Sequence, residues 1–194
     1  MKPMLSSAFL LNRYKQEMMK LKTRKAIKED VGQIVELLNS AYRTQSGRSW
    51  TTEKIWVEGN RITVKQLNEE LEKEQFELFV GENEQKQIIA CIGLTFEDIS
   101  VEIGTFAIKP MIQNVGYGRE MLGFVEHYIT VDHPQISNLF MYVLDVRHEL
   151  VTYYQRRGYQ QTGNILPYPL DADVGLPLAS IQLIEMKKYL KPAM

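Results

Sequence analysis

Hydrophobic residues recur along this chain with two periods, and the change from one period to the other divides the sequence into predicted elements. Seven segments alternate or are rich in β-forming residues, which is the pattern of strands. These segments are 21–27, 76–82, 88–96, 99–108, 138–144, 159–164 and 179–189. Four other segments repeat their apolar residues every three or four positions and are predicted to be helices. They are 28–41, 62–74, 116–131 and 148–157.

The order of these elements is β-α-α-β-β-β-α-β-α-β-β. Helices interrupt a meander of strands, so we predict an α/β (α+β mixed) fold, with a central mixed sheet of about seven strands and helices on both faces. Segments 42–60 and 166–177 have no period and are predicted to be loops. A chain of 194 residues accommodates one domain, which we place at 21–194, with residues 1–20 as an N-terminal extension.

Composition narrows the functional classes. The formal net charge is −1 at pH 7, so the overall charge gives no case for binding nucleic acid or a membrane surface. No apolar run reaches the roughly 18 residues of a membrane span. The single cysteine, Cys91, cannot form an internal disulfide, which fits a reducing cytoplasm. The three histidines lack the spacing of metal ligands, so no metal site is predicted.

The main chemical signal is a strand, a glycine-bearing loop and a helix in succession. The predicted strand 99–108 leads to the loop Gln113-Asn114-Val115-Gly116-Tyr117-Gly118, where the helix begins. The first four amides of a helix have no partner inside the helix, and together with the helix dipole they attract phosphate. Glycine at 116 and 118 lets the backbone approach such an anion closely, because no Cβ intervenes.

Two nucleotide-binding motifs do not match this loop. The next glycine is Gly123, two positions too late for the third glycine of a dinucleotide-binding loop. A P-loop requires Gly-Lys followed by Ser or Thr, whereas this chain has Gly118-Arg119-Glu120. The loop therefore predicts an anion site of a different kind.

A second motif lies downstream, at Tyr153-Tyr154-Gln155-Arg156-Arg157-Gly158-Tyr159. This aromatic-Tyr-x-x-x-Gly-aromatic run and the earlier Gln-x-x-Gly-x-Gly resemble, in the same order, the two signatures of the GNAT superfamily of N-acetyltransferases. The resemblance covers the chain from about Leu21 to Tyr189. It implies a mostly antiparallel sheet whose fourth and fifth strands are parallel and splay apart. The gap between these strands would admit the pantetheine arm of acetyl-CoA.

The resemblance also implies which residues bind acetyl-CoA, the expected cosubstrate. Backbone amides of the glycine loop would hold the pyrophosphate, and the free edge of the fourth strand would pair with the pantetheine amides. A main-chain N–H near Ile108 would polarise the thioester carbonyl. The expected cofactor-binding residues are Phe106, Ala107, Ile108, Gln113, Asn114, Val115, Gly116, Tyr117, Gly118, Arg119 and Arg147. Arg147 stands where many members have asparagine, and it would contact a CoA phosphate or the acceptor, or cap the sheet.

Two residues are candidates for catalysis. Tyr154 occupies the tyrosine position of the family, and a phenol is close enough in pKa to a thiol to protonate the departing thiolate. Its neighbour Tyr153 is interpreted as a packing residue. Glu102 lies 14 residues before Gly116, an offset at which some histone-type members have a catalytic glutamate. Many other members use ordered water as the base, and Glu97 and Asp98 in the preceding turn are weaker alternatives, so these choices stay open.

The resemblance implies an acetyl-CoA-dependent N-acetyltransferase that moves an acetyl group to a primary amine by direct attack in a ternary complex. The alternative is a non-catalytic acyl-CoA-binding or interaction module on the same fold, and transfer of a longer acyl group is also open. The expected partner is a small-molecule amine or a peptide amine, and a homodimer is compatible with the family. The acceptor-facing segments 42–74 and 166–177 carry no motif that names the acceptor, although Glu53 and Glu58 are candidates for attracting a cationic amine.

Overall fold

The computed structural model describes residues 21–44, 52–113 and 115–190. The predicted extension 1–20 and the loop residue Asn114 lie outside the described residues. The helices are α2 (Val31–Arg43), α3 (Val64–Leu71), α4 (Tyr117–Asp132) and α5 (His148–Gln155). Short 3₁₀ turns are η1 (Lys28–Asp30), η2 (Pro110–Ile112) and η3 (Leu170–Ala172). The strands are β1 (Lys22–Lys25), β2 (Val57–Glu58), β3 (Phe76–Glu82), β4 (Ile88–Phe96), β5 (Ser100–Ile108), β6 (Asn138–Leu144), β7 (Gln160–Pro167), β8 (Leu176–Pro177) and β9 (Gln182–Tyr189).

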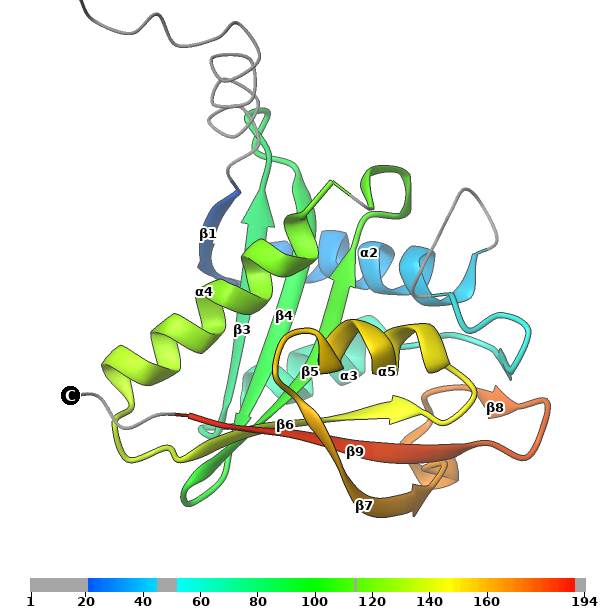
Figure 1. Ribbon diagram of the computed structural model, residues 1–194. Coiled ribbons are helices and arrows are strands. Elements are labelled where there is room, and N and C mark those ends of the chain that lie inside the picture. The colour runs from blue at the N-terminus through cyan, green and yellow to red at the C-terminus, as the bar shows by residue number, and fades with distance from the viewer. Residues whose placement is uncertain (1–20, 45–51, 114, 191–194) are drawn as a thin grey trace, which may run out of the picture.

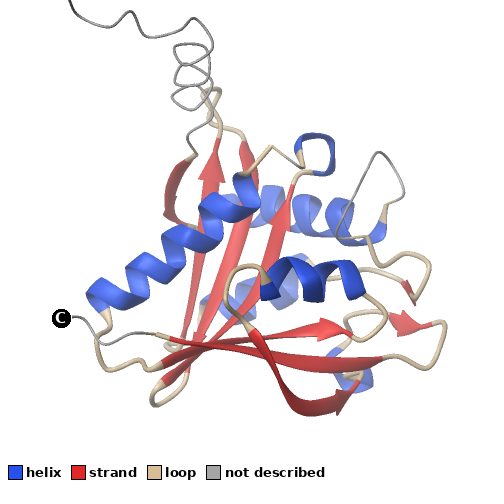
Figure 2. Ribbon diagram, in the orientation of Figure 1, coloured by secondary structure: helices blue, strands red, loops and turns tan. Residues whose placement is uncertain are grey.

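Seven strands form one sheet in the order β1-β3-β4-β5-β6-β9-β7 (Figure 1). Every neighbouring pair is antiparallel except β5 and β6, which are parallel. Helices α4 and α5 lie in front of the sheet in this view, whereas α2 and α3 lie behind it (Figure 2). The predicted fold class, a mixed and mostly antiparallel sheet with helices on both faces, is confirmed.

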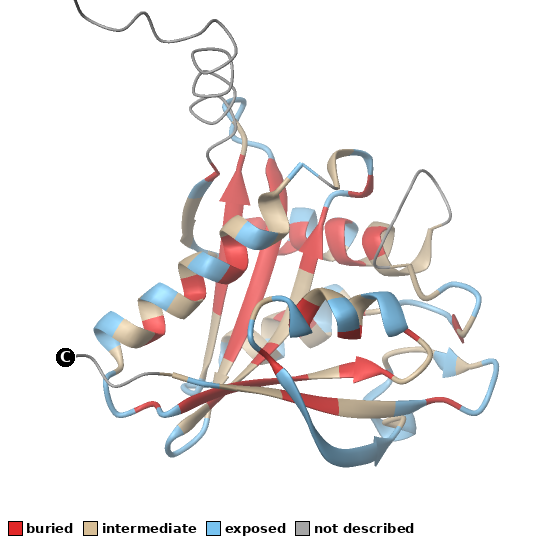
Figure 3. Cartoon of the chain, viewed as in Figure 1, coloured by how far each residue is buried: buried red, intermediate tan, exposed pale blue. Residues whose placement is uncertain are grey.

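Each face of the sheet has its own apolar core, because the strand side chains alternate between the two faces. The core under α4 contains Met121, Leu122, Val125 and Ile129, which recur at the three- and four-residue spacing of one helix face. The core under α2 is built in the same way, from Ile34, Leu37, Leu38 and Ala41. Figure 3 shows this buried centre of the sheet and helices against exposed loops.

The two segments predicted as loops contain structure that the sequence pattern did not indicate. Strands β2 and β8, of two residues each, pair antiparallel and join segment 42–60 to segment 166–177. A two-residue strand has no period of its own, and its hydrogen bonds depend on a partner far along the chain. Strand β7, which precedes β8 in the chain, was predicted at 159–164 and runs on to Pro167. All eight of its residues are exposed, so its sequence has no strong alternation of buried apolar and exposed polar residues (Figure 3).

The parallel pair β5–β6 positions the functional site. In the described residues the two strands pair only at one end, where Ser100 to Glu102 lie opposite Asn138 to Phe140. A β-bulge also interrupts the β4–β5 ladder, where Ile92 alone faces both Thr105 and Phe106, and Thr105 has a φ of 47°. Bulges bend a strand and increase its twist. The end of β5 is therefore left with a free edge, as a splayed pair requires.

No helix in the described part of the chain is long and apolar enough to cross a membrane.

Candidate functional site

Two cavities share a wall where β5 and β6 separate. The first has a volume of about 360 Å³, and the second has a volume of about 250 Å³. Four residues line both, namely Tyr42, Phe106, Leu150 and Tyr154. A molecule in the first cavity and a molecule in the second would therefore meet at Tyr154 and the free edge of β5.

The N-terminus of α4 forms one end of the first cavity. Gly116 is the N-cap residue with a φ of 110°, a conformation that strongly favours glycine, and a Cβ built there would enter open space. The first intrahelical bond joins the amide of Glu120 to the carbonyl of Gly116 at 3.0 Å. The amides of Tyr117, Gly118 and Arg119 therefore have no partner within the helix. All four residues from Gly116 to Arg119 line the cavity, which makes this end suited to a phosphate.

Cationic side chains line the same cavity. Besides Arg119 they are Arg156 and Arg157, which belong to the second motif but were not among the predicted site residues. The guanidinium carbon of Arg157 lies 3.4 Å from the centroid of the Tyr153 ring, and its Nη1 donates to the Tyr153 carbonyl at 2.9 Å. Its Nε is buried without a hydrogen-bond partner among the described residues. The residue as a whole is half-buried, and an unused donor on a guanidinium suits this position to an anionic ligand.

Tyr153 is closer to the site than its interpretation as a packing residue implied. It lines the first cavity, and a Cβ added to Gly118 would lie 3.1 Å from the Tyr153 hydroxyl. The Gly118 backbone therefore approaches this phenol closely, which explains the small residue at that position. Its aromatic neighbour in the motif, Tyr154, lies nearly perpendicular to it, at an interplanar angle of 84°.

The free edge of β5 forms the side of the first cavity. Phe106 and Ile108 line the cavity, whereas Ala107 is buried in the core under α2. The Tyr42 hydroxyl donates to the Phe106 carbonyl at 2.8 Å, and the side-chain amide of Gln113 donates to the Ile108 carbonyl at 2.9 Å. Both bonds fix the edge of the strand from side chains that themselves line the cavity.

Tyr154 lies at the junction of the cavities. It is 9% exposed, and its hydroxyl makes no hydrogen bond to the described residues, so the phenol proton is available to a ligand. Burial raises the pKa of Tyr154 well above its ordinary value. The phenol therefore stays protonated throughout the neutral range. It can donate a proton or a hydrogen bond to a negative charge that develops in this apolar setting.

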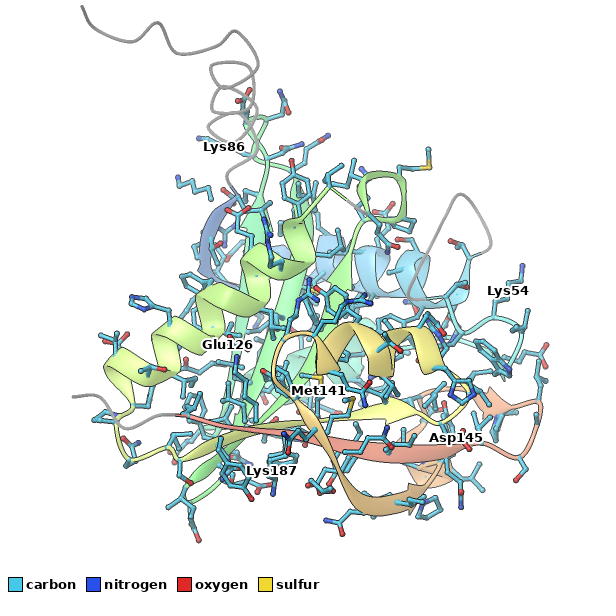
Figure 4. All side chains as sticks on the ribbon, viewed as in Figure 1. Lys54, Lys86, Glu126, Met141, Asp145 and Lys187 are labelled. Atoms are coloured by element: carbon cyan, nitrogen blue, oxygen red, sulfur yellow. The ribbon has the colours of Figure 1, made fainter. Side chains whose placement is uncertain are left out.

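The second cavity contains four charged side chains, of which three come from the segments preceding β5 and following β6. They are Glu53, Arg61, Glu102 and Arg147. Burial raises the pKa of Glu102, the carboxylates of Glu97 and Glu70 raise it further, and Arg61 lowers it. Met141 of β6, which also lines this cavity, is labelled in Figure 4.

Arg147 lines the second cavity and not the first. It is 2% exposed and precedes α5, where its Nε donates to the carboxylate of Glu149 and its Nη1 donates to the Thr52 carbonyl at 3.0 Å. The structure thus places Arg147 with Glu102 in the second cavity, which Phe106 also lines. Of the two acids considered for attracting an amine, Glu53 lines this cavity and Glu58 is an exposed residue of β2.

Most of the predicted site residues are brought together. Those that line the first cavity are Phe106, Ile108, Gln113, Gly116, Tyr117, Gly118, Arg119 and Tyr154. Val115 is 45% exposed and is not part of the lining, and Asn114 lies outside the described residues. Cys91 is fully buried, and burial raises the pKa of its thiol to about 12, so the thiol stays protonated near neutral pH.

Each cavity is also lined by residues that were not predicted from the sequence. In the first cavity they include Ile112 and Arg157, and in the second they include Arg61 and Tyr168. The paired arginines beside Tyr154 could have been noticed, because cations near a phosphate site are expected. Arg61 and Tyr168 carry no such signal, because they reach the cavity only through tertiary structure. No group of three or more metal-ligating side chains exists within the described ranges.

Comparisons with known proteins bear on the family and the fold of this chain. A family model described as the acetyltransferase (GNAT) domain matches residues 48–166, which include both motifs. The fold resembles that of the ribosomal-protein-S18-alanine N-acetyltransferase from Escherichia coli, with a TM-score of 0.67 at 13% identity over 90% of this chain and 97% of that one. An N-acetyltransferase from Staphylococcus aureus Mu50 gives a TM-score of 0.65 at 15% identity, over 89% and 99% of the two chains.

A third structure, the spermidine N-acetyltransferase from Vibrio cholerae in complex with CoA and spermine, gives a TM-score of 0.63 at 18% identity. The match covers 87% of this chain and 95% of that one. At such identities the likeness concerns the fold. No curated protein sequence gives a significant match to this chain.

Proposed function

This chain belongs to the GNAT family of acetyltransferases, and from that premise we propose that it transfers an acetyl group from acetyl-CoA to a primary amine. The transfer would occur by direct attack within a ternary complex. The observation that carries this proposal is the meeting of two cavities at Tyr154, with a helix N-terminus lining one and the half-buried carboxylate of Glu102 lining the other.

The first cavity is the proposed site of acetyl-CoA. The amides from Tyr117 to Arg119 would receive the pyrophosphate, because they are unpaired and lie at the positive end of the α4 dipole. The Arg157 side chain would supply positive charge through its unused Nε donor. The free edge of β5 at Phe106 and Ile108 supports the binding of the pantetheine amides, in the manner of an added strand.

The second cavity is the proposed site of the acceptor amine. The neutral amine attacks the thioester carbonyl, a C–N bond forms, and the C–S bond breaks to release the CoA thiolate. Glu102 accepts the proton that the amine loses, directly or through a water molecule, and Tyr154 donates a proton to the thiolate. A main-chain N–H near Ile108 stabilises the oxyanion that forms on the carbonyl. Burial supports the assignment of Glu102, because a raised pKa makes the carboxylate a stronger base.

Calorimetry with acetyl-CoA, CoA, NADH and ATP tests the binding half of this proposal. We expect acetyl-CoA and CoA to bind roughly tenfold or more tightly than the other two nucleotides, a difference of about 1.4 kcal/mol. A panel of primary amines, with release of the CoA thiol as the readout, tests the transfer half. Absence of acetyl-CoA binding would contradict the proposal. Binding without turnover of any amine would instead favour an acyl-CoA-binding module.

A further inference from the structure

Arg61 lines the second cavity, and among the described residues its side chain forms no ion pair. Its backbone amide donates to the Asn39 side-chain oxygen at 2.7 Å, and its guanidinium carbon lies 5.4 Å from the centroid of the Tyr42 ring. Among the described residues its side chain makes no ion pair and donates no hydrogen bond. The residue is half-buried and lines the cavity, so its five N–H donors are available to a ligand there.

Glu102 is the corresponding anion. Its carboxylate lines the same cavity and, among the described residues, it takes part in no ion pair and accepts no hydrogen bond. Arg61 lowers the pKa of Glu102 whereas Glu97 and Glu70 raise it, so the Arg61 charge is felt at this carboxylate. The two unpaired groups have opposite signs and line one cavity.

The other charged side chains of the cavity already have partners. Glu53 accepts from Arg43 at 2.8 Å, and both of these side chains are nearly buried. Arg147 pairs with Glu149. These internal pairs leave Arg61 and Glu102 as the two charges that a ligand can satisfy, within the part of the chain that the structure describes.

We propose that the acceptor is a compact zwitterion of the amino-acid type, with Arg61 binding its carboxylate while Glu102 faces its amine. This inference rests on the proposed function and names the class of its acceptor. A guanidinium matches a carboxylate in a planar, two-hydrogen-bond arrangement, which fixes the orientation of the acceptor as well as holding it. The amine would then lie beside Glu102, in the cavity that shares Tyr42 and Tyr154 with the first one.

The size and charge of the cavity favour this class over longer cationic amines. Its volume of 250 Å³ is below the roughly 300–1,000 Å³ of typical small-molecule sites, so the acceptor is small. The spermidine N-acetyltransferase of similar fold was solved with spermine, a polyamine. In this chain a polycation would face Arg61, which has no anionic partner among the described residues, and like charges in a partly desolvated site repel.

Matched acceptors give the first test. Initial rates of thiol release are measured at saturating acetyl-CoA with a set of free amino acids, the decarboxylated amine of each, the amide of each, and spermidine. For the amino acid that reacts best, we expect kcat/KM to be roughly 100-fold or more higher than for its decarboxylated amine. The decarboxylated amine has no carboxylate to bind Arg61, so this guanidinium stays unpaired. Equal rates for the members of each pair, or a preference for spermidine, would overturn the inference.

Substitution of Arg61 gives the second test. Arg61→Gln is expected to lower kcat/KM for the free amino acid by roughly 100-fold and for its decarboxylated amine by little, and Arg61→Lys is expected to restore part of the loss. Lys65→Gln is the matched control, because it removes the same charge from a side chain that is 84% exposed on α3. A uniform loss for both kinds of acceptor would assign Arg61 a structural role and refute the inference.

Calorimetry of Arg61→Gln with acetyl-CoA separates this inference from the function on which it rests. Unchanged acetyl-CoA affinity shows that the variant is folded and that the first cavity is intact. If the wild-type protein acetylates amines equally well with and without a carboxylate, the proposed acetyltransferase function is retained and only the zwitterionic acceptor is refuted. A wild-type protein that binds no acetyl-CoA, or acetylates no amine, would fail at the proposed function itself.

Discussion

The two cavities differ in how the chain builds them. Every residue that lines the first cavity, apart from Tyr42, comes from the segment between Phe106 and Arg157, and much of its anion site consists of backbone amides. The second cavity collects side chains from Tyr42 to Leu183, through the connection between α2 and α3, strands β5 and β6, helix α5 and the β7–β8 connection. A site made of backbone and of one contiguous segment leaves a motif in the sequence. A site made of side chains from distant segments leaves none, and it is free to differ between proteins that share a fold.

A substitution at Gly116 should have the largest effect, and it should act on the first cavity alone. Gly116→Glu places a carboxylate in the open space where the proposed pyrophosphate lies, so we expect acetyl-CoA affinity to fall by roughly 100-fold or more. The φ of 110° adds backbone strain of about 1–3 kcal/mol. Calorimetry measures the affinity, and circular dichroism with thermal melting checks that the variant is folded. A folded variant with wild-type affinity would remove Gly116 from the binding site.

Gly123→Ala is the matched control on the same helix. A Cβ at Gly123 meets no atom within 4 Å, and alanine is favoured over glycine in a helix by about 1 kcal/mol. This variant should melt at a higher temperature and bind acetyl-CoA as the wild type does. Together the two glycines separate an effect on the anion site from an effect on α4 itself.

A substitution at Tyr154, which lines both cavities, should lower turnover and leave acetyl-CoA binding unchanged. Tyr154→Phe removes a hydroxyl without a hydrogen bond to the described residues, so the fold and acetyl-CoA affinity should be little changed. Turnover should fall by roughly 100-fold, within the range that general acid catalysis contributes. The measurement is kcat under conditions in which the chemical step limits the rate. Unchanged kcat under those conditions would exclude Tyr154 as the acid.

Tyr159→Phe provides the comparison for a phenol outside both cavities. Its hydroxyl donates to Glu126 at 3.0 Å, and the ring is almost completely buried. Loss of this bond should lower the free energy of unfolding by about 1 kcal/mol and leave kcat unchanged. A loss of turnover in both variants would indicate that the core under α4, and not the Tyr154 hydroxyl, is what the reaction needs.

The same contrast explains how far the sequence predicted the molecule. Strands 76–82, 88–96 and 138–144 were predicted with the bounds that the structure has, because each is a dense run of β-forming residues in the middle of the sheet. The Gly116 loop was predicted because its geometry requires glycine at a fixed place. Arg61 was not predicted, because nothing local distinguishes it from any other loop arginine. The β2–β8 pair was missed for the same reason, since its partners meet only in the folded chain.

Glu102, in the second cavity, should have the smallest effect on rate and the clearest dependence on pH. Burial raises its pKa, so in the wild type kcat/KM should fall as the pH drops through that raised pKa and the carboxylate takes up a proton. In Glu102→Gln, kcat/KM should no longer fall at low pH in this way, and above the raised pKa it should be roughly tenfold lower than in the wild type. At low pH the two enzymes should have similar kcat/KM, because the wild-type residue is itself protonated there. Glu97→Gln is the control, because removing that exposed negative charge should lower the Glu102 pKa and move the limb to lower pH.

Stability should change in the opposite direction to activity. A carboxyl group whose pKa is higher in the folded state than in the unfolded state binds its proton more readily when folded, so its contribution to stability is lost as the pH rises through the folded pKa. Glu102→Gln stays neutral and should therefore melt at a higher temperature than the wild type above that pH, and at a similar temperature below it. A pH–rate profile and a melting profile that both match the wild type would exclude Glu102 as the base and leave that role to water. The second cavity would then discriminate acceptors through Arg61 without taking part in proton transfer.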